Sequence, residues 1–234
     1  MPDSLEGKRV VVIGGTSGIG FGVAEAAKAA GARVVVGSSQ QSKVDDAVAR
    51  LGTGAEGAVV DASSEDNVAG FFARLGGFDH LVYTAGDWDR PADQWDLEAS
   101  QWIFRIRFWG ALRAIKHSRD TIARDGSITL TDGAAGRRPR PGGAISSAGA
   151  MAIENLVRGL AIDLAPVRVN CVCPGLILTE AVRIAPEQLE RMTSRQPLPR
   201  AGTPREVAEA YLYLMRGTYT TGDVLLVDGG FTLG

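Results

Sequence analysis

The chain has few residues that could build a disulfide framework or a metal site. Its 234 residues include two cysteines, Cys171 and Cys173, and two histidines, His80 and His117, that are distant in sequence. A secreted domain held together by disulfides would need more cysteines. A zinc site would need cysteines and histidines at short spacing. We therefore expect two buried, reduced cysteines and no metal site.

Long apolar runs and a charge of one sign are also missing. No run approaches the roughly 20 apolar residues of a membrane span, and the N-terminal stretch MPDSLEGKR has no apolar signal core. The net charge is only −2, which offers nothing to attract nucleic acid or a membrane surface. These absences predict a cytoplasmic protein that binds neither.

What the chain does have is a glycine-rich stretch, VVVIGGTSGIG, at 10–20. Four β-branched residues predict a buried strand. The glycines that follow permit a tight turn, and a helical run begins directly after them. Free N–H groups and the positive end of the helix dipole would favour a phosphate there. The alternative is a strand–helix turn without a ligand, because a glycine pattern alone is weak evidence.

Strands and helices alternate along the rest of the chain. This rhythm predicts an α/β fold, a doubly wound parallel sheet of about seven strands, with 1–234 as a single domain. Long helices are expected at 97–123 and 143–164, and 180–200 reads as irregular. The expected strands are 10–13, 33–37, 57–60, 79–84, 126–131, 167–172 and 224–227. The ligand crevice of such a sheet lies at the carboxyl ends of its strands.

The motifs resemble those of the short-chain dehydrogenase/reductase family over nearly the whole chain. The loop at 14–20 is similar to TGxxxGxG, with Ile13 in place of the threonine. Thr84-Ala85-Gly86 resembles NNAG, and the chain ends in TG…VDGG. The resemblance implies a Rossmann fold that binds a nicotinamide dinucleotide. The residues it implies for the cofactor are Gly14, Thr16, Ser17, Gly18, Ile19, Gly20, Ser38, Ser39, Lys43, Asp61, Ala62, Ala85, Gly86, Pro174, Gly175, Ile177 and Thr179.

The stretch 38–43, SSQQSK, favours NADP(H) over NAD(H). In related proteins an acid near position 38 binds the adenosine ribose and selects NAD. No acid is present here, whereas hydroxyls, an amide and Lys43 can bind a 2′-phosphate.

The catalytic tetrad that the resemblance implies is absent. Arg107 takes the asparagine position, Gly133 the serine, Ser146 the tyrosine and Ala150 the lysine. The family's tyrosine would supply the proton that hydride transfer requires. Ser146, Asp132 and Arg107 are the candidates in its place, with Ser147 and Tyr83 as further hydroxyls near the crevice.

Two hypotheses follow from this. The first is an NADP(H)-dependent oxidoreductase of unknown substrate with an atypical mechanism, in which an activated alkene or an iminium would need less help from an acid. The second is a pseudoenzyme, a scaffold that binds the cofactor without turnover. Both hypotheses include cofactor binding, because the glycine-rich loop is intact.

Two features bear on ligands and partners. Arg137, Arg138 and Arg140 follow the fifth strand and favour an anionic small-molecule substrate, unless they form a solvated or ion-paired loop. By the resemblance, helices 97–123 and 143–164 form the interface of a homodimer or homotetramer. Trp95, Trp102, Phe104, Phe108 and Trp109 would contribute aromatic surface there, or core.

Overall fold

The structure is a computed structural model and describes residues 4–86, 95–180, 182 and 184–234. Seven parallel strands form one sheet in the order β3-β2-β1-β4-β5-β6-β7, which confirms the predicted α/β, doubly wound fold. The strands are β1 (Arg9–Ile13), β2 (Arg33–Ser38), β3 (Ala55–Val59), β4 (Phe78–Tyr83), β5 (Ile122–Thr131), β6 (Arg168–Pro174) and β7 (Val224–Val227).

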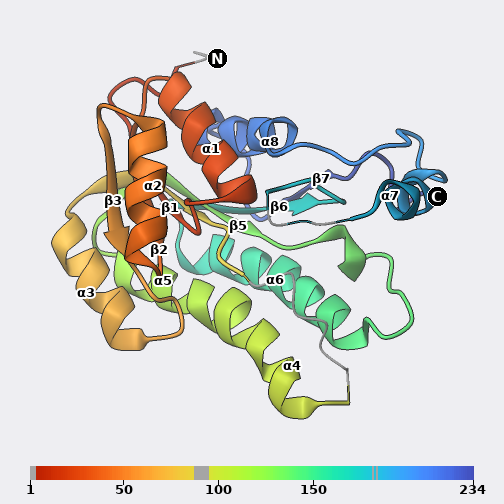
Figure 1. The fold of residues 1–234 in the computed structure, drawn as a ribbon. Coiled ribbons are helices and arrows are strands. Elements are labelled where there is room, and N and C mark those ends of the chain that lie inside the picture. The colour runs from red at the N-terminus through yellow and green to blue at the C-terminus, as the bar shows by residue number, and fades with distance from the viewer. Residues whose placement is uncertain (1–3, 87–94, 181, 183) are drawn as a thin grey trace.

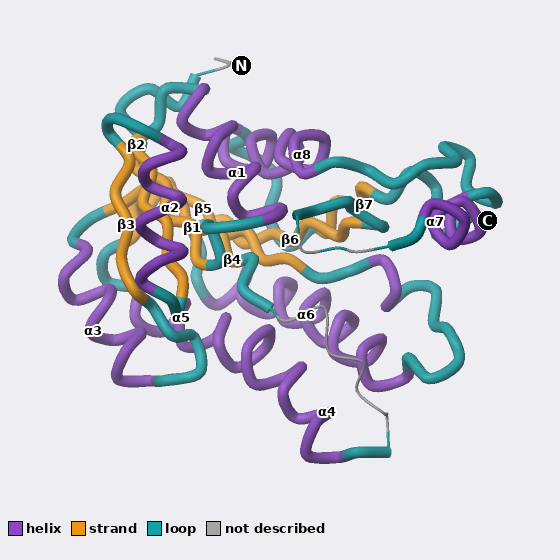
Figure 2. The backbone as a smooth tube through the Cα atoms, in the orientation of Figure 1, coloured by secondary structure: helices purple, strands orange, loops and turns teal. Residues whose placement is uncertain are grey.

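Helices cover both faces of the sheet (Figures 1 and 2). One layer holds α1, α2 and α8, and the other holds α3, α5 and α6. None of the described helices is long and apolar enough to cross a membrane. The helices are α1 (Gly18–Ala29), α2 (Gln41–Leu51), α3 (Glu65–Leu75), α4 (Leu97–Ile103), α5 (Ala111–Ser118), α6 (Ala144–Asp163), α7 (Pro186–Thr193) and α8 (Pro204–Arg216), with the π-helical segment η1 (Phe104–Gly110) and the 3₁₀ turn η2 (Ala134–Gly136).

The order of the strands reverses beside β1. Val12 pairs with Val36 of β2 on one side and with Val82 of β4 on the other. The chain therefore winds outward in both directions from this point. A crevice opens at the carboxyl ends of strands at such a switch point.

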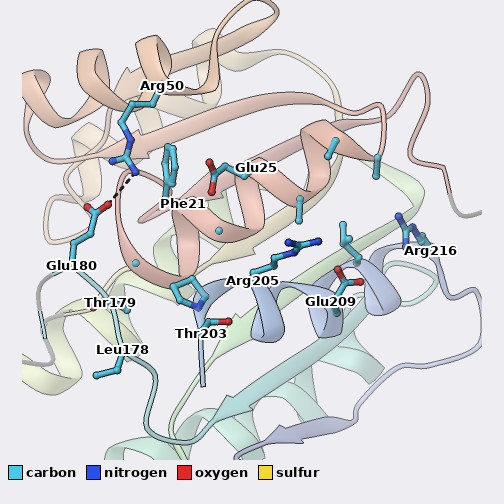
Figure 3. Close-up of a pocket in the computed structure, with 17 residues that line it drawn as sticks. Phe21, Glu25, Arg50, Leu178, Thr179, Glu180, Thr203, Arg205, Glu209 and Arg216 are labelled. Atoms are coloured by element: carbon cyan, nitrogen blue, oxygen red, sulfur yellow. Dashed lines mark hydrogen bonds and ion pairs between the residues drawn. The ribbon is translucent and has the colours of Figure 1, made fainter. Parts of the chain in front are cut away.

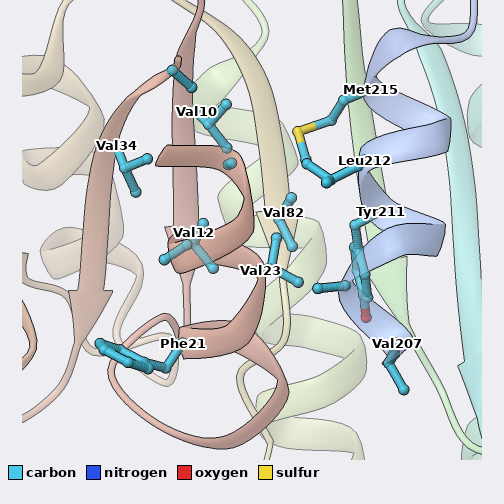
Figure 4. Close-up of a cluster of buried hydrophobic side chains, with 14 of the residues drawn as sticks. Val10, Val12, Phe21, Val23, Val34, Val82, Val207, Tyr211, Leu212 and Met215 are labelled. Atoms are coloured by element: carbon cyan, nitrogen blue, oxygen red, sulfur yellow. The ribbon is translucent and has the colours of Figure 1, made fainter. Parts of the chain in front are cut away.

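An apolar core joins the first layer of helices to the sheet (Figure 4). Val10, Val12 and Val34 project from the strands toward Val23 of α1, and Tyr211 of α8 is fully buried beside them. β-Branched side chains suit a sheet that is covered on both faces. Each such side chain stabilises the fold by about 1.5–3 kcal/mol through burial, so this layer holds the start of α1 firmly against β1.

Two helix starts follow the capping signals in the sequence. The Ser64 hydroxyl accepts a hydrogen bond from the N–H of Asn67 at the start of α3. Thr203 and Glu206 form a reciprocal capping box at the start of α8, with Pro204 in its first turn. These side chains satisfy N–H groups that lack partners within the helix.

One expectation for the second half was wrong. The stretch 97–123 is not one helix but α4, η1 and α5, and it ends at Ser118, whose carbonyl accepts a bond from the N–H of Thr121 in a turn. β5 then begins at Ile122, which pairs with Phe78. The stretch 180–200 holds the short helix α7, which starts at Pro186. The side chain of Trp102 lies outside the described part.

Candidate functional site

One crevice lies at the carboxyl ends of the central strands and has a volume of about 960 Å³. All 17 residues that the sequence suggests for a cofactor line it, from the loop after β1 to Thr179 after β6. They come from five separate segments, so the parallel sheet is what brings them together. The size and position are typical of a ligand site in an open α/β fold.

The loop after β1 packs closely against the end of β4. Gly14 has φ +86°, and a β-carbon there would lie 2.5 Å from the backbone nitrogen of Ala85. Gly18, with φ +53°, faces the side chain of Thr179 across the crevice. At Gly14 both conformation and space exclude a side chain, and at Gly18 the positive φ favours glycine.

The start of α1 is open to an anion. Ser17 precedes the helix without capping it through its side chain, and no acidic residue stands in the first turn. The N–H groups of the first turn therefore point into the crevice with the positive end of the helix dipole. This cradle fits a dinucleotide diphosphate.

The far end of the crevice, after β2, carries Ser38, Ser39, Gln40 and Lys43. Lys43 is exposed, and no ion pair or hydrogen bond of it occurs among the described residues. Asp61, which ends the neighbouring segment, accepts a hydrogen bond from the N–H of Ser63. Hydroxyls and a cation at this end of the crevice are groups that can bind a phosphate.

The positions of the usual tetrad carry no acid. Gly133 lines the crevice, and Ala150 is buried against Gly136. Ser146 is exposed on the first turn of α6 and is not among the residues that line the crevice. Two other candidate hydroxyls are engaged elsewhere: Tyr83 donates to the carbonyl of Ile106 at 2.5 Å, and Ser147 to the carbonyl of Ala135 at 2.9 Å.

Arg107 lies in η1, and its side chain packs against Gly86, which follows β4. A β-carbon on Gly86 would lie 2.8 Å from the Nε atom of Arg107. Gly86 lines the crevice, whereas Arg107 does not. The guanidinium therefore sits directly behind the crevice wall on the side of the asparagine position.

Asp132 is the buried acid of the crevice. It follows β5, lines the cavity and is only 1 % exposed. Neither oxygen of its carboxyl group has a hydrogen-bond partner among the described residues. An ionised carboxylate in this position would be costly. Burial raises the pKa of the Asp132 carboxyl to about 7.

Three further side chains surround Asp132. One carboxylate oxygen of Asp132, one of Glu154 and the Sγ atom of Cys173 all lie within 4.8 Å of one another. Arg137 donates from Nε and Nη2 to the two oxygens of Glu154, at 2.7 and 3.1 Å. Glu154 was not among the residues predicted for the site, although its spacing of four residues from Ala150 puts it on the same face of α6. Both cysteines are free and buried, as expected.

The backbone that carries Asp132 is held in place from two sides. The Thr131 hydroxyl donates to the carbonyl of Tyr83 at 2.9 Å and lies 2.6 Å from the hydroxyl of Tyr211. Because Thr131 uses its single proton on Tyr83, Tyr211 must be the donor in the second bond. The N–H of Asp132 continues the ladder to Val172.

The arginine-rich loop is largely ion-paired or tied down. Arg137 binds Glu154, and Arg138 donates to the carbonyl of Phe231 at 2.8 Å. Arg140 alone of the three lines the crevice, with its guanidinium carbon 4.9 Å from the ring centre of Phe231. Any role in binding an anionic substrate therefore falls to Arg140.

A second cavity, of about 740 Å³, lies between α1 and α8 (Figure 3). Arg50 stacks on Phe21 at 3.9 Å and pairs with Glu180 at 3.1 Å, which joins α2 to the segment after Thr179. Gly18 and Thr179 border this cavity and the crevice alike. Its other walls carry charges of both signs on α1 and α8.

Comparisons with known proteins agree over the whole chain. The family model described as Enoyl-(Acyl carrier protein) reductase matches residues 14–232. Short-chain dehydrogenase/reductase ucsE of Acremonium sp is 37 % identical, over 97 % of this chain and 96 % of that protein. Short-chain dehydrogenase/reductase malC of Malbranchea aurantiaca is 32 % identical, over 99 % and 97 %.

Solved structures extend this likeness to three dimensions. The structure of MalC Reductase/Diels-Alderase from Malbranchea aurantiaca covers 100 % of this chain and 99 % of its own, with 32 % identity and a TM-score of 0.92. A small-chain dehydrogenase in complex with NADPH covers 97 % and 99 %, with 33 % identity and a TM-score of 0.82. The chain therefore belongs to the short-chain dehydrogenase/reductase family.

Proposed function

We propose that this protein is an NADP(H)-dependent oxidoreductase that reduces a polarised double bond of a small molecule, with Asp132 as the proton donor. The observation that carries the proposal is the buried Asp132 carboxyl, which lines the crevice and has no hydrogen-bond partner among the described residues. A pKa of about 7 suits a group that must hold a proton and release it near neutral pH.

The chain's own residues would act as follows. The N–H groups at the start of α1 bind the diphosphate, and the glycines of the loop let it approach the backbone. A reduced nicotinamide, when bound, supplies a hydride to an electron-poor carbon of the substrate. Asp132 holds a proton on its carboxyl group and gives it to the oxygen, nitrogen or carbon atom that receives the electron pair, which leaves Asp132 ionised.

NADP(H) is the proposed cofactor because Ser38, Ser39 and Lys43 surround the far end of the crevice without a carboxylate among them. The NADPH complexes among similar structures support this choice: besides the small-chain dehydrogenase, a blue fluorescent protein from a metagenomic library binds NADPH and has a TM-score of 0.89.

Arg107 is a second candidate catalytic group. Its fixed positive charge behind Gly86 would stabilise negative charge that develops on the substrate. Ser146 remains a weaker candidate, since it is exposed and outside the crevice lining. The alternative of a cofactor-binding scaffold without turnover gains no support from relatives named as dehydrogenases and reductases.

The proposed assembly is a homodimer or homotetramer through the 97–123 and 143–164 segments. Trp109 at the end of η1 is 53 % exposed and Met151 of α6 is 40 % exposed, and such apolar surface favours an interface. Sedimentation of the wild type against Trp109→Glu tests this, and a wild type that sediments as a monomer contradicts it.

The test of the reaction begins with NADPH binding and continues with NADPH oxidation over a panel of carbonyls, enones and imines. Asp132→Asn should bind NADPH like the wild type but lose turnover by about a hundredfold or more, because general acid catalysis contributes about 10²–10⁴. Ser146→Ala tests the weaker candidate and should keep its activity, because Ser146 is exposed and outside the crevice lining. Binding without oxidation of any substrate would favour the scaffold, and full turnover in Asp132→Asn would exclude Asp132 as the donor.

A further inference from the structure

Asp132 lies in a small cluster of charged side chains, made of two buried acids and the partly exposed Arg137. Glu154 of α6 is 2 % exposed, and Arg137 grips both of its oxygens. This pair is neutral as a unit, with one negative and one positive charge. Asp132 lies within 4.8 Å of Glu154 but makes no bond to Arg137.

The charges of Glu154 and Arg137 determine which protonation state of Asp132 is favoured. An ionised Asp132 would place a second carboxylate beside Glu154 and leave the buried cluster with a net charge of −1. A protonated Asp132 leaves the cluster neutral. Like charges at this distance in a buried site strongly disfavour double ionisation. The acid is therefore held in its protonated form by its neighbours as well as by burial.

We propose that Glu154, anchored by Arg137, is a positioning residue that keeps the proton on Asp132 in the resting protein. This rests on the proposed function, in which Asp132 delivers that proton. Arg137 serves to hold the Glu154 carboxylate in a fixed position, because its guanidinium binds both carboxylate oxygens. Glu154 thus acts on the substrate only through Asp132.

The other titratable groups around Asp132 stay neutral near pH 7. Cys173 and Cys171 approach from β6 and Tyr211 from α8, and burial raises the pKa of all three side chains. The positive charge of Arg137 is already included in the charge balance, as the partner of Glu154. The charge of Glu154 is therefore the neighbouring negative charge that changes when this residue is replaced.

Infrared titration of the protein without cofactor or substrate tests the inference. The C=O stretch of the protonated Asp132 carboxyl is the band that Asp132→Asn removes. In Glu154→Gln its midpoint should fall by roughly one to two pH units, because a negative charge is lost while Arg137 stays. In Arg137→Gln it should rise, because the compensating cation is lost. Glu209→Gln, exposed on α8, should leave it unchanged.

Each result is decisive. Opposite shifts in the two variants support the proposal. An unmoved midpoint in both, or no such band in the wild type at neutral pH, overturns it. Arg137 is partly exposed, so its variant still gives an answer if Glu154→Gln does not fold. Turnover is not measured in this experiment, and a failure of Asp132 as the proton donor would show only in NADPH oxidation.

Discussion

A β-carbon on Gly20 would overlap the carbonyl oxygen of Gly14 and the hydroxyl of Thr84. The loop after β1 thus closes on itself between the start and end of the glycine motif. This contact turns the first N–H groups of α1 toward the crevice. The geometry of the phosphate cradle depends on a missing side chain at Gly20, in addition to the positive φ of Gly14.

Gly20→Ala should therefore abolish NADPH binding and lower the free energy of unfolding by about 1–3 kcal/mol, the usual cost of overpacking. The methyl group would meet backbone at Gly14, which cannot rotate away as a side chain can. Fluorescence titration with NADPH and urea unfolding measure the two effects.

Gly159→Ala in α6 is the matched control. A β-carbon at Gly159 meets nothing within 4 Å, and the residue is exposed in the middle of the helix. The change should raise the free energy of unfolding by about 0.5–1 kcal/mol through helix propensity and leave NADPH binding alone. An equal loss of binding in both variants would show that the cradle argument is wrong.

The grouping of the suggested cofactor residues in one crevice could be predicted because its signals are local. Glycines, strand ends and polar residues after strands each carry their own pattern, and the parallel sheet collects them at one edge. Ser38 ends β2 and Asp61 follows the adjacent β3, so their placement in one crevice required only the strand order.

The environment of Asp132 could not be predicted in the same way. Its neighbours Glu154 and Cys173 are 22 and 41 positions further along the chain, and only the packing of α6 on β6 brings them together. The break of 97–123 was missed for a similar reason. Gly110 approaches Tyr83 and Ala62 there, and this tertiary contact leaves no periodic signal in the sequence.

The raised pKa of Asp132 predicts a pH-dependent stability. Its folded pKa of about 7 lies above the ordinary aspartate value of 3.8, so the folded state holds a proton that the unfolded state loses. This contribution is complete below about pH 4 and is lost as the pH rises to about 7. It amounts to roughly 4 kcal/mol, at 1.36 kcal/mol per pKa unit.

Urea unfolding of the wild type and Asp132→Asn between about pH 4 and pH 8 measures this effect. The difference in unfolding free energy between the two proteins should change in favour of Asp132→Asn as the pH rises. Taking the difference also removes the opposing effect of His80, whose pKa burial lowers to about 4. A difference that is independent of pH would refute the raised pKa.

Arg138 and Arg140 should respond differently to replacement by Gln. Arg138→Gln removes the bond to the Phe231 carbonyl and should cost about 1 kcal/mol of unfolding free energy. Arg140→Gln should change stability by less than about 0.5 kcal/mol, because Arg140 is exposed. Its effect should instead be a higher KM for an anionic substrate and an unchanged KM for a neutral one. An equal KM effect on both substrates would remove Arg140 from substrate selection.

Cofactor choice should reverse with a single acid at the end of β2. Ser38→Asp would place a carboxylate where the 2′-phosphate is proposed to lie, so NADPH should bind about a hundredfold more weakly while NADH gains a ribose partner. The NADPH loss corresponds to about 2.7 kcal/mol, within the range for hydrogen bonds to charged groups. Lys43→Gln should weaken NADPH about tenfold, less so at high salt because the residue is exposed. Lys43→Arg keeps the charge and should keep the preference. Isothermal titration with both nucleotides decides the matter, and a wild type that binds NADH as tightly as NADPH would contradict the proposed specificity.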